Sequence, residues 1–330
     1  MVTPPGAGNL PAVARHAAAM LRAAGLGDHQ VAAVTRLRGG SKKGVYRLRR
    51  ADGFSVILYV WSRDEDYWPA KPAADDTGVF AHASGIGLFE RCATRLQAAG
   101  VRVPRVYLTD QSQAVYPADI ALVEDVRGGT LEELLESAPR AAEPVMERLG
   151  GMLTSMGQQR SARIGKVGTD PADPASGCEL IVLDRALRQL ADAAERVPRV
   201  ADARPRLEET LRTMAAAVTP RTEYALIHGE LGPDHVLVTE QHEPVVIDIE
   251  GAMYFDAEWE HVFLRLRFGQ AYRWLRTTGL DEHRMRLYAL ALDLSLIEGP
   301  LRLLDGGYPD RDQMLIIVGH AVERALDATA

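Results

Sequence analysis

The residues of this sequence best placed to do chemistry lie in two neighbouring stretches near position 240. Residues 226–238 read LIHGELGPDHVLV, and residues 246–251 read VIDIEG. Each stretch sets carboxylates beside short apolar segments that read as strands, so a pair of hairpins could aim several carboxylates at one point. Phosphoryl transfer needs such an arrangement, because one carboxylate receives the hydroxyl proton and others hold Mg²⁺ against the phosphates. The alternative is an acidic surface hairpin, although carboxylates embedded so closely in apolar strands are less typical of a solvated face.

The two stretches resemble the catalytic motifs of aminoglycoside phosphotransferases and the related choline-type kinases. Those proteins carry H-G-D-x-x-x-x-N, then a strand and I-D-x-E or I-D-x-D. This chain matches at His228, Gly229, Asp248 and Glu250 and in the four-residue spacing. The resemblance implies an enzyme that binds ATP (or GTP) and Mg²⁺ and phosphorylates a hydroxyl group. By position, it makes Glu230 the catalytic carboxylate and Asp248 the main magnesium ligand.

The same resemblance implies three supporting roles. His235 takes the place of a catalytic residue that binds a second metal ion or braces the loop, and Glu250 becomes an accessory metal ligand or network carboxylate. Residues 256–260 look like the start of the family's next helix, whose acidic residue steadies the catalytic loop.

Three positions depart from the family pattern. The catalytic Asp is replaced by Glu230, the Asn by His235 and the later structural Asp by Glu260. One added methylene moves a carboxylate by roughly an ångström, and misplacement on that scale can cost ~10²-fold in rate. His235 could still bind a metal ion as neutral imidazole, although magnesium prefers oxygen, and Asp234 is an alternative ligand beside it. The departures leave open a pseudokinase that binds nucleotide or a peptide without transferring phosphate.

A glycine-rich stretch, GGSKKGVYR at residues 39–47, lies between the first two predicted strands. Glycines let the backbone approach phosphates, and backbone N–H groups and lysines can then hold them. The position of this stretch in the first hairpin of a kinase-like lobe predicts a nucleotide-binding loop. The residues expected to contact the nucleotide there are Gly40, Ser41, Lys42, Lys43 and Gly44.

The third predicted strand lacks the phosphate-binding lysine that the kinase resemblance implies. Tyr59 holds that position and cannot supply a cation, and Ile57 lies two residues before it on the same expected nucleotide-facing side. Lys42, Lys43 or Arg47 could fill the role from the neighbouring loop or strand.

Two more positions come from the kinase resemblance. Glu90, on the helix after the third strand, is placed where kinases keep the carboxylate partner of the lysine; a solvated helix residue is the alternative. The stretch that joins the two lobes offers backbone groups to adenine, so Glu124 and Val126 are nominated by position.

The elements that must position these residues follow from patterning. Alternating or β-branched segments, separated by Gly39-Gly40 and Asp52-Gly53, predict a meander at 31–37, 45–50 and 54–61. A helix ending near Gly100 and strands at 106–108 and 120–123 complete a small β-rich part. After Gly128-Gly129 the apolar period becomes helical. Helices are expected at 131–135 and 145–156. A long helix follows, with one face marked by Leu180, Leu183, Leu187, Leu190 and Ala194, and a further helix carries Leu207, Leu211 and Met214.

This order predicts an α+β, bilobal protein kinase-like fold, with a small β-rich N-terminal lobe and a larger, mainly helical C-terminal lobe. We expect residues 1–126 to form the nucleotide-binding lobe, with 1–9 disordered, and residues 127–330 to form the catalytic and substrate-binding lobe. Trp61, Tyr67, Trp68 and Phe80 surround a long stretch after the third strand. They could form a lid or a substrate wall, and ordinary packing is the alternative.

Composition bounds the function classes. The chain has 330 residues, 47% hydrophobic and 25% charged, which suits a soluble globular protein. A net charge of −7 argues against a nucleic-acid or anionic-membrane partner, because such partners need a basic footprint. Cys92 and Cys178 lack metal-ligand spacing and fit a reducing compartment. No apolar run reaches the ~18 residues that span a bilayer, so we expect a cytoplasmic protein.

The acceptor is the least determined part of the prediction. The resemblance implies a small molecule such as an aminoglycoside, and hence antibiotic resistance, or another natural product, a sugar or a choline-like alcohol. A peptide Ser/Thr in natural-product biosynthesis is a further alternative. The oligomeric state stays open.

Overall fold

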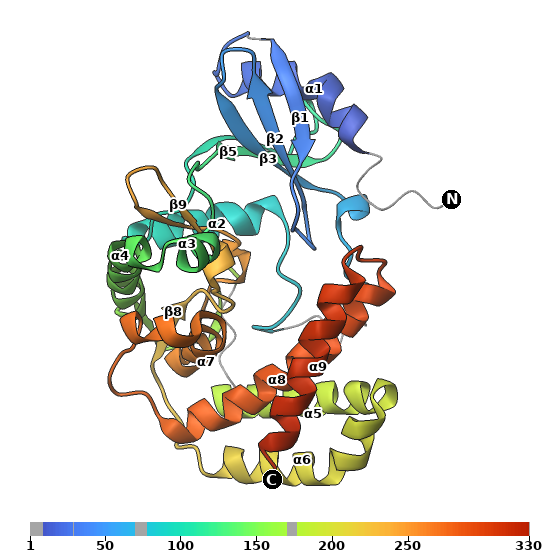
Figure 1. The fold of residues 1–330 in the computed structure, drawn as a ribbon, viewed down its shortest axis with the longest axis vertical. Helices are drawn as coiled ribbons and strands as arrows, with labels where there is room; N and C mark the ends of the chain where they lie inside the picture. The colour runs from blue at the N-terminus through green and yellow to red at the C-terminus, as the bar shows by residue number, and fades with distance from the viewer. Residues whose placement is uncertain (1–8, 29, 70–77, 170–176, 330) are drawn as a thin grey trace.

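The computed structural model describes residues 9–28, 30–69, 78–169 and 177–329. The predicted disorder at the N-terminus therefore lies outside the described residues, apart from Asn9. Within the described residues, the chain divides into a β-sheet region at the N-terminal end and a mainly helical region after it (Figure 1). The predicted α+β, kinase-like fold is confirmed.

The N-terminal region is a five-stranded antiparallel sheet in the order β1-β2-β3-β5-β4. Its elements in chain order are α1 (Leu10–Ala23), β1 (Val31–Arg36), β2 (Gly44–Arg50), β3 (Ser55–Trp61), η2 (Arg63–Glu65), α2 (Ile86–Ala98), β4 (Val106–Asp110) and β5 (Asp119–Glu124). All five strands predicted for this region are present, with ends shifted by one or two residues at most of them.

Every residue of β3 is buried, because a helix packs on each face of the sheet. On one face, Leu58 and Val60 pack against α1 residues such as Met20. On the other face, Tyr59 and its neighbours pack against α2 through Phe89. A central strand covered on both sides explains why the sequence of β3 is apolar without alternation.

The second region carries a small hairpin, a four-stranded sheet and most of the helices. The hairpin pairs β9 (Val236–Val238) with β10 (Pro244–Val246), and the sheet has the order β6 (Arg160–Ser161), β8 (Tyr224–Ile227), β11 (Met253–Phe255), β7 (Gly165–Lys166). The helices are α3 (Leu131–Ser137), α4 (Pro139–Gly157), α5 (Cys178–Arg196), α6 (Pro198–Ala216), α7 (Ala257–Phe268), α8 (Glu282–Asp305) and α9 (Arg311–Asp327), with short 3₁₀ turns η3 (Pro233–His235), η4 (Ile249–Gly251) and η5 (Gly269–Trp274).

The buried face of α5 overlaps the predicted leucine stripe only in part. Leu190 is buried, and Leu183, Leu187 and Ala194 pack partly buried against the core, whereas Leu180 is 48% exposed. The other buried positions include Val182, Ala186 and Ala193. The reason is that α5 packs between α6 and α8, and the small alanine side chains let those helices approach closely. Gln189, directly before Leu190, is also buried.

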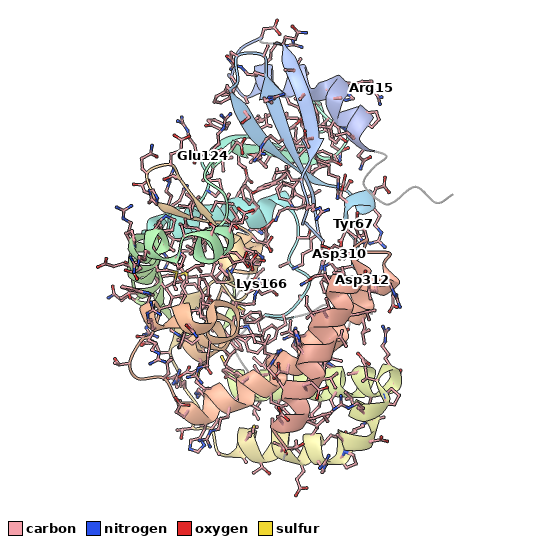
Figure 2. The ribbon with its side chains drawn as sticks, viewed as in Figure 1. Arg15, Tyr67, Glu124, Lys166, Asp310 and Asp312 are labelled. Atoms are coloured by element: carbon pink, nitrogen blue, oxygen red, sulfur yellow. The ribbon has the colours of Figure 1, made fainter. Side chains whose placement is uncertain are left out.

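A long segment after β3 crosses from the sheet to the helices. We call residues 62–69 and 78–85 the crossing segment. Tyr67 packs its ring edge on Tyr308 beside the end of α8, with ring centroids 5.4 Å apart, and Lys166 donates to the carbonyl of Ala81 (Figure 2). The crossing segment therefore connects the two regions on the side where α8 and α9 rise toward the sheet (Figure 1).

Candidate active site

Side chains of α7 hold the loop between β8 and β9 by hydrogen bonds to its backbone groups. Gly229 has φ +94°, which favours glycine, and a Cβ there would lie 3.0 Å from Met253. The N–H of Gly229 donates to Glu260 Oε2 at 2.7 Å, and its carbonyl accepts from Trp259 Nε1 at 3.1 Å. The prediction that an acidic residue at the start of α7 steadies this loop is confirmed, with Glu260 in that role. The support from Trp259 was missed, because a tryptophan at helical spacing from Phe263 indicates core packing and gives no sign of a contact with the loop.

His228 and His235 join the loop to the segment that follows β10. His228 is buried, and its Nε2 lies 2.9 Å from the carbonyl of Ile247. His235 Nδ1 lies 2.9 Å from the carbonyl of Glu230, and its Nε2 lies 3.9 Å from Asp248 Oδ2. These contacts are of the kind that a bracing residue would make, and both roles expected of His235, bracing and metal binding, stay predictions. The side chain of Glu230 lies on the exposed surface of this loop.

Asp248 adopts a left-handed backbone conformation, with φ +57° and ψ +44°, immediately before η4. This single turn brings Asp248 and Glu250 to the same point, where both carboxylates meet the ammonium of Lys43. Lys43 Nζ lies 3.1 Å from Asp248 Oδ1 and 2.5 Å from Glu250 Oε1. Lys43 and Glu250 are buried, whereas the Asp248 side chain is 44% exposed. The cluster thus joins the glycine-rich loop to the segment after β10.

The charges of this cluster support one another. Burial alone would raise the pKa of Asp248, but Lys43, His235 and Lys42 outweigh it and lower the pKa of this carboxyl well below its ordinary value. Burial likewise disfavours the charged form of Lys43, yet Glu250 and Asp248 raise its pKa above the ordinary value. Asp248 is therefore a carboxylate and Lys43 an ammonium at any pH near neutrality.

Lys43 supplies the cation that β3 lacks. Val45 pairs with Tyr59 in the sheet, so the residues just before β2 lie beside this part of β3. The ammonium of Lys43 lies 5.2 Å from the centroid of the Tyr59 ring. Arg47, another candidate, is instead paired with Asp125 at 2.9 Å. Of the three candidates that the sequence offered, the structure brings Lys43 to the carboxylates.

Glu90 does not take the position expected of it. The lysine's carboxylate partners are Asp248 and Glu250. Glu90 lines a groove between α2 and the segment after β7, together with Arg91 and Val167, and in the described part of the chain no ion pair joins it to a lysine. Because the cation comes from the loop before β2 and not from β3, its geometry favours the carboxylates after β10. The expected pairing is therefore wrong.

The glycine-rich loop is fixed by contacts from the crossing segment. Gly40 has φ +75°, and a Cβ there would lie 2.5 Å from the carbonyl of Lys43, so the turn that presents Lys43 requires glycine. Ser41 accepts from the N–H of Tyr67 with its carbonyl and from Trp68 Nε1 with its hydroxyl, at 2.9 and 3.0 Å. A Cβ on Gly44 would meet the carboxyl of Glu65 at 2.6 Å.

The other residues predicted to contact the nucleotide lie in or next to the strands β3 and β5. Ile57 is buried beside Tyr59 on the face of the sheet that α2 covers. The N–H of Glu124 donates to the carbonyl of Arg105 at 2.8 Å, and its carboxylate pairs with Arg102 at 3.0 Å. Val126 is 7% exposed just beyond β5. The adenine contacts of these residues stay a prediction.

Among the described residues there is no cluster of three or more His, Cys, Asp or Glu side chains that could hold a metal ion alone. The pair formed by Asp248 and Glu250 nevertheless suits Mg²⁺, because that ion takes oxygen ligands and is usually held by one or two carboxylates plus substrate phosphates.

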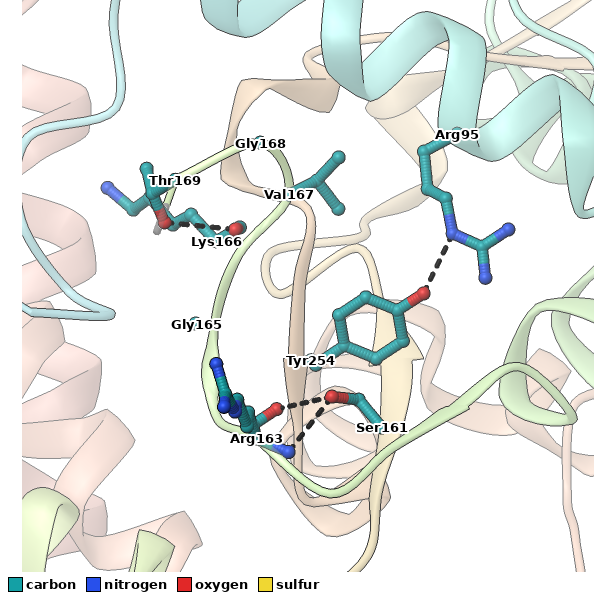
Figure 3. A pocket seen from close by; sticks show the side chains of 9 residues that line it. All are labelled: Arg95, Ser161, Arg163, Gly165, Lys166, Val167, Gly168, Thr169 and Tyr254. Atoms are coloured by element: carbon teal, nitrogen blue, oxygen red, sulfur yellow. Dashed lines mark hydrogen bonds between the residues drawn. The ribbon is translucent and has the colours of Figure 1, made fainter. Parts of the chain in front are cut away.

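A cavity of about 230 Å³ lies outside this site, between α2 and the β6–β7 turn (Figure 3). Arg95, Arg163 and Lys166 line it with the hydroxyl of Tyr254, which accepts from Arg95 Nε at 2.7 Å. No residue predicted to act in catalysis lines this cavity.

Comparison with known proteins gives the site a family context. A sequence model of the APH phosphotransferase enzyme family matches residues 33–288. No curated protein matches the chain. In the described residues, no helix combines the length and the apolar character needed to cross a membrane.

Solved structures of similar fold cover nearly the whole chain. They include a thermostable mutant of aminoglycoside phosphotransferase APH(4)-Ia in a ternary complex with AMP-PNP and hygromycin B, at 15% identity, a TM-score of 0.62 and coverage of 94% of this chain and 98% of that one. Choline kinase LicA from Streptococcus pneumoniae matches at 13% identity and a TM-score of 0.60, covering 91% and 94%. Spectinomycin phosphotransferase APH(9)-Ia, in complex with ADP and spectinomycin, matches at 12% identity and a TM-score of 0.60, covering 95% and 98%.

Proposed function

Because this chain belongs to the APH phosphotransferase enzyme family, we propose that it is an ATP- and Mg²⁺-dependent O-phosphotransferase acting on a hydroxyl group of a small molecule. The observation that carries the proposal is the cluster of Lys43, Asp248 and Glu250 beside the loop of Glu230. It gathers a cation from the N-terminal region and two carboxylates from the second region at one point.

The reaction follows from the positions of these groups. The acceptor hydroxyl forms a bond to the γ-phosphorus of ATP while the bond from that phosphorus to the bridging oxygen breaks, which releases ADP. Glu230 accepts the hydroxyl proton and later passes it to solvent. Its surface position on the braced loop suits this exchange. Lys43, supported by the Tyr59 ring, binds phosphate oxygens and neutralises their charge.

Asp248 and Glu250 would hold magnesium through their oxygens. Bound there, the ion would neutralise charge on the β- and γ-phosphates. Lys43 lies within ion-pair distance of both carboxylates, so it would stand beside the magnesium and the phosphates that they hold.

The test measures ATP consumption over a panel of acceptors that includes hygromycin B, spectinomycin, choline, hydroxy acids, sugars and serine peptides. Asp248→Asn should abolish turnover, on the order of 10³-fold or more, because electrostatic stabilisation of the transferring group is lost. Lys43→Met should weaken ATP binding and lower turnover as well. Asp184→Asn, at an exposed ion pair with Arg188 on α5, is the matched control and should leave turnover unchanged.

Full turnover by Asp248→Asn would contradict the proposal. Nucleotide binding without turnover on every acceptor would favour the pseudokinase alternative. Running the panel with GTP beside ATP determines the nucleotide, which the neighbouring complexes with ADP and AMP-PNP leave open for this chain.

Two broader assignments belong to the same proposal. An enzyme that consumes ATP works where ATP is abundant, and both cysteines, Cys92 and Cys178, are free thiols, so we place it in the cytoplasm. A role in antibiotic resistance follows only if an aminoglycoside or another antibiotic proves to be the acceptor in the panel.

A further inference from the structure

Arg185, on α5, lies beside the catalytic loop, and among the residues that the structure describes it has no carboxylate in an ion pair with it. Its guanidinium stacks over the ring of Phe80 at 4.4 Å from the centroid and lies 5.7 Å from the centroid of Trp259. Trp259 in turn donates to the carbonyl of Gly229, the residue before Glu230. The guanidinium is therefore one side chain away from the catalytic loop.

The only polar contact found for Arg185 in the described part of the chain is with Ser295 Oγ at 3.0 Å. A guanidinium carries five N–H donors, so most of its donor capacity is unused. The side chain is partly buried, and this burial lowers the pKa of Arg185 to about 10, although Glu230 and Glu298 raise it. Burial of a charge without a paired counter-charge is costly.

The two carboxylates near Arg185 do not form an ion pair with its guanidinium in the described part of the chain. Glu298 is already bound by Arg302 at 3.1 Å and by Gln189 at 3.4 Å. Glu230 makes no ion pair with Arg185 within the described ranges, and as the predicted catalytic carboxylate it faces the acceptor. The cation therefore lies beside the predicted position of the acceptor hydroxyl with its donors available.

On the basis of the proposed phosphotransferase function, we propose that Arg185 recognises an anionic oxygen group, a carboxylate or a phosphate, on the acceptor alcohol. The planar guanidinium matches either group with two parallel hydrogen bonds. The rings of Phe80 and Trp259 keep the guanidinium in place, which reduces the entropy lost when the acceptor binds.

The proposal separates this chain from its structural neighbours by acceptor charge. A cationic acceptor, such as choline, would set a positive charge against Arg185 and would be disfavoured. The net acidity of the whole protein does not decide the matter, because the charges within a few ångströms of the acceptor dominate its binding.

The test uses acceptors in matched pairs that differ in charge: gluconate with glucitol, N-acetylserine with its amide, and glucose 6-phosphate with glucose. Binding is measured by calorimetry to the enzyme saturated with ADP and Mg²⁺, and turnover is measured with ATP. At least one anionic member should bind more tightly than its neutral partner. The carboxylate and phosphate pairs show which of the two groups Arg185 takes.

Arg185→Met retains an unbranched stem between the two rings and removes the charge. It should weaken binding of the anionic member, and raise its KM, by about 10- to 100-fold, as expected for loss of a charge-assisted hydrogen-bonded pair. The neutral partner and the KM for ATP should be little changed, and Arg185→Lys should restore part of the affinity. Arg188→Met, three positions later on the exposed face of α5, is the control and should behave like the parent protein.

Three outcomes would overturn the assignment: no anionic compound binds, only neutral or cationic acceptors are phosphorylated, or Arg185→Met affects both members of a pair equally. Failure of the proposed function looks different, because then even ATP consumption that depends on Asp248 would be absent. Circular dichroism of each variant separates a folding defect from a binding defect.

Discussion

Glu260 is the residue whose ionisation is expected to affect stability near neutral pH. Its side chain is 3% exposed beneath the loop of Glu230, and burial raises the pKa of its carboxyl to about 7, although the N–H groups of Gly229 and His228 lower it. The folded protein therefore binds a proton here that the unfolded chain releases at lower pH. Its contribution to stability is full below about pH 4.5 and is lost as pH rises through about 7.

Replacement of this residue by its neutral isostere should remove that pH dependence. Between pH 5 and 8, Glu260→Gln should gain up to ~3 kcal/mol of unfolding free energy relative to the parent protein. Urea unfolding at several pH values measures the difference, and Glu240→Gln, on the exposed β9–β10 turn, is the control. If the curves of parent and Glu260→Gln stay parallel over this range, Glu260 is not the titrating group.

At the scale of elements, the glycine-rich loop determines where Lys43, the proposed phosphate-binding cation, lies. Gly40 and Gly39 both have positive φ, +75° and +87°, so an alanine at either position costs about 1 kcal/mol of backbone strain. They differ in their surroundings: a Cβ on Gly40 would lie 2.5 Å from the carbonyl of Lys43, whereas one on Gly39 meets nothing within 4 Å.

The two glycines therefore form a matched pair for testing the loop. Gly40→Ala should displace Lys43 and raise the Kd for ATP by about 10-fold or more, because one well-placed ionic contact is lost. Gly39→Ala should lose only the stability that backbone strain costs and should keep its nucleotide affinity. Calorimetric titration with ATP and Mg²⁺ measures both. Equal losses of affinity in the two variants would show that strain, and not the position of Lys43, governs binding.

Much of this element structure could be predicted from sequence, because it depends on local patterns. The three-stranded meander and the strands around Glu230 and Asp248 follow from turn glycines and short apolar runs. The source of the cation could be narrowed only to three residues, because the contact between Lys43 and Asp248 spans 205 positions of the chain. The prediction for α5 failed at Leu180 for a related reason, since Leu180 and Val182 compete for burial and only the neighbouring helices decide between them.

At the scale of the whole molecule, two connections join the N-terminal sheet to the helical region near the proposed active site. One is the ion cluster of Lys43 with Asp248 and Glu250. The other is the crossing segment, where Trp68 donates to Ser41 of the glycine-rich loop and packs beside Gly299 and Arg302 of α8. Both connections pass through the glycine-rich loop, so nucleotide binding and the relative position of the two regions should be coupled.

Trp68 is the residue at which this coupling can be tested without touching the predicted catalytic groups. The guanidinium of Arg302 on α8 stacks 4.7 Å from the centroid of the Trp68 ring. The indole N–H of Trp68 donates to the hydroxyl of Ser41 at 3.0 Å. Trp68→Ala should lower the unfolding free energy by ~1–2 kcal/mol, through loss of the cation–π contact and one hydrogen bond. The glycine-rich loop then keeps its ion pairs with Asp248 and Glu250 but loses its contact with the crossing segment. The thermal shift produced by ADP and Mg²⁺ should therefore also become smaller. Trp274→Ala serves as the control, since that tryptophan is 36% exposed in η5 and, among the interactions of the described residues, its ring contacts Arg273 and not the glycine-rich loop. The coupling is absent if Trp68→Ala loses stability but keeps the full ADP-induced shift. The crossing segment would then stabilise the fold without affecting nucleotide binding.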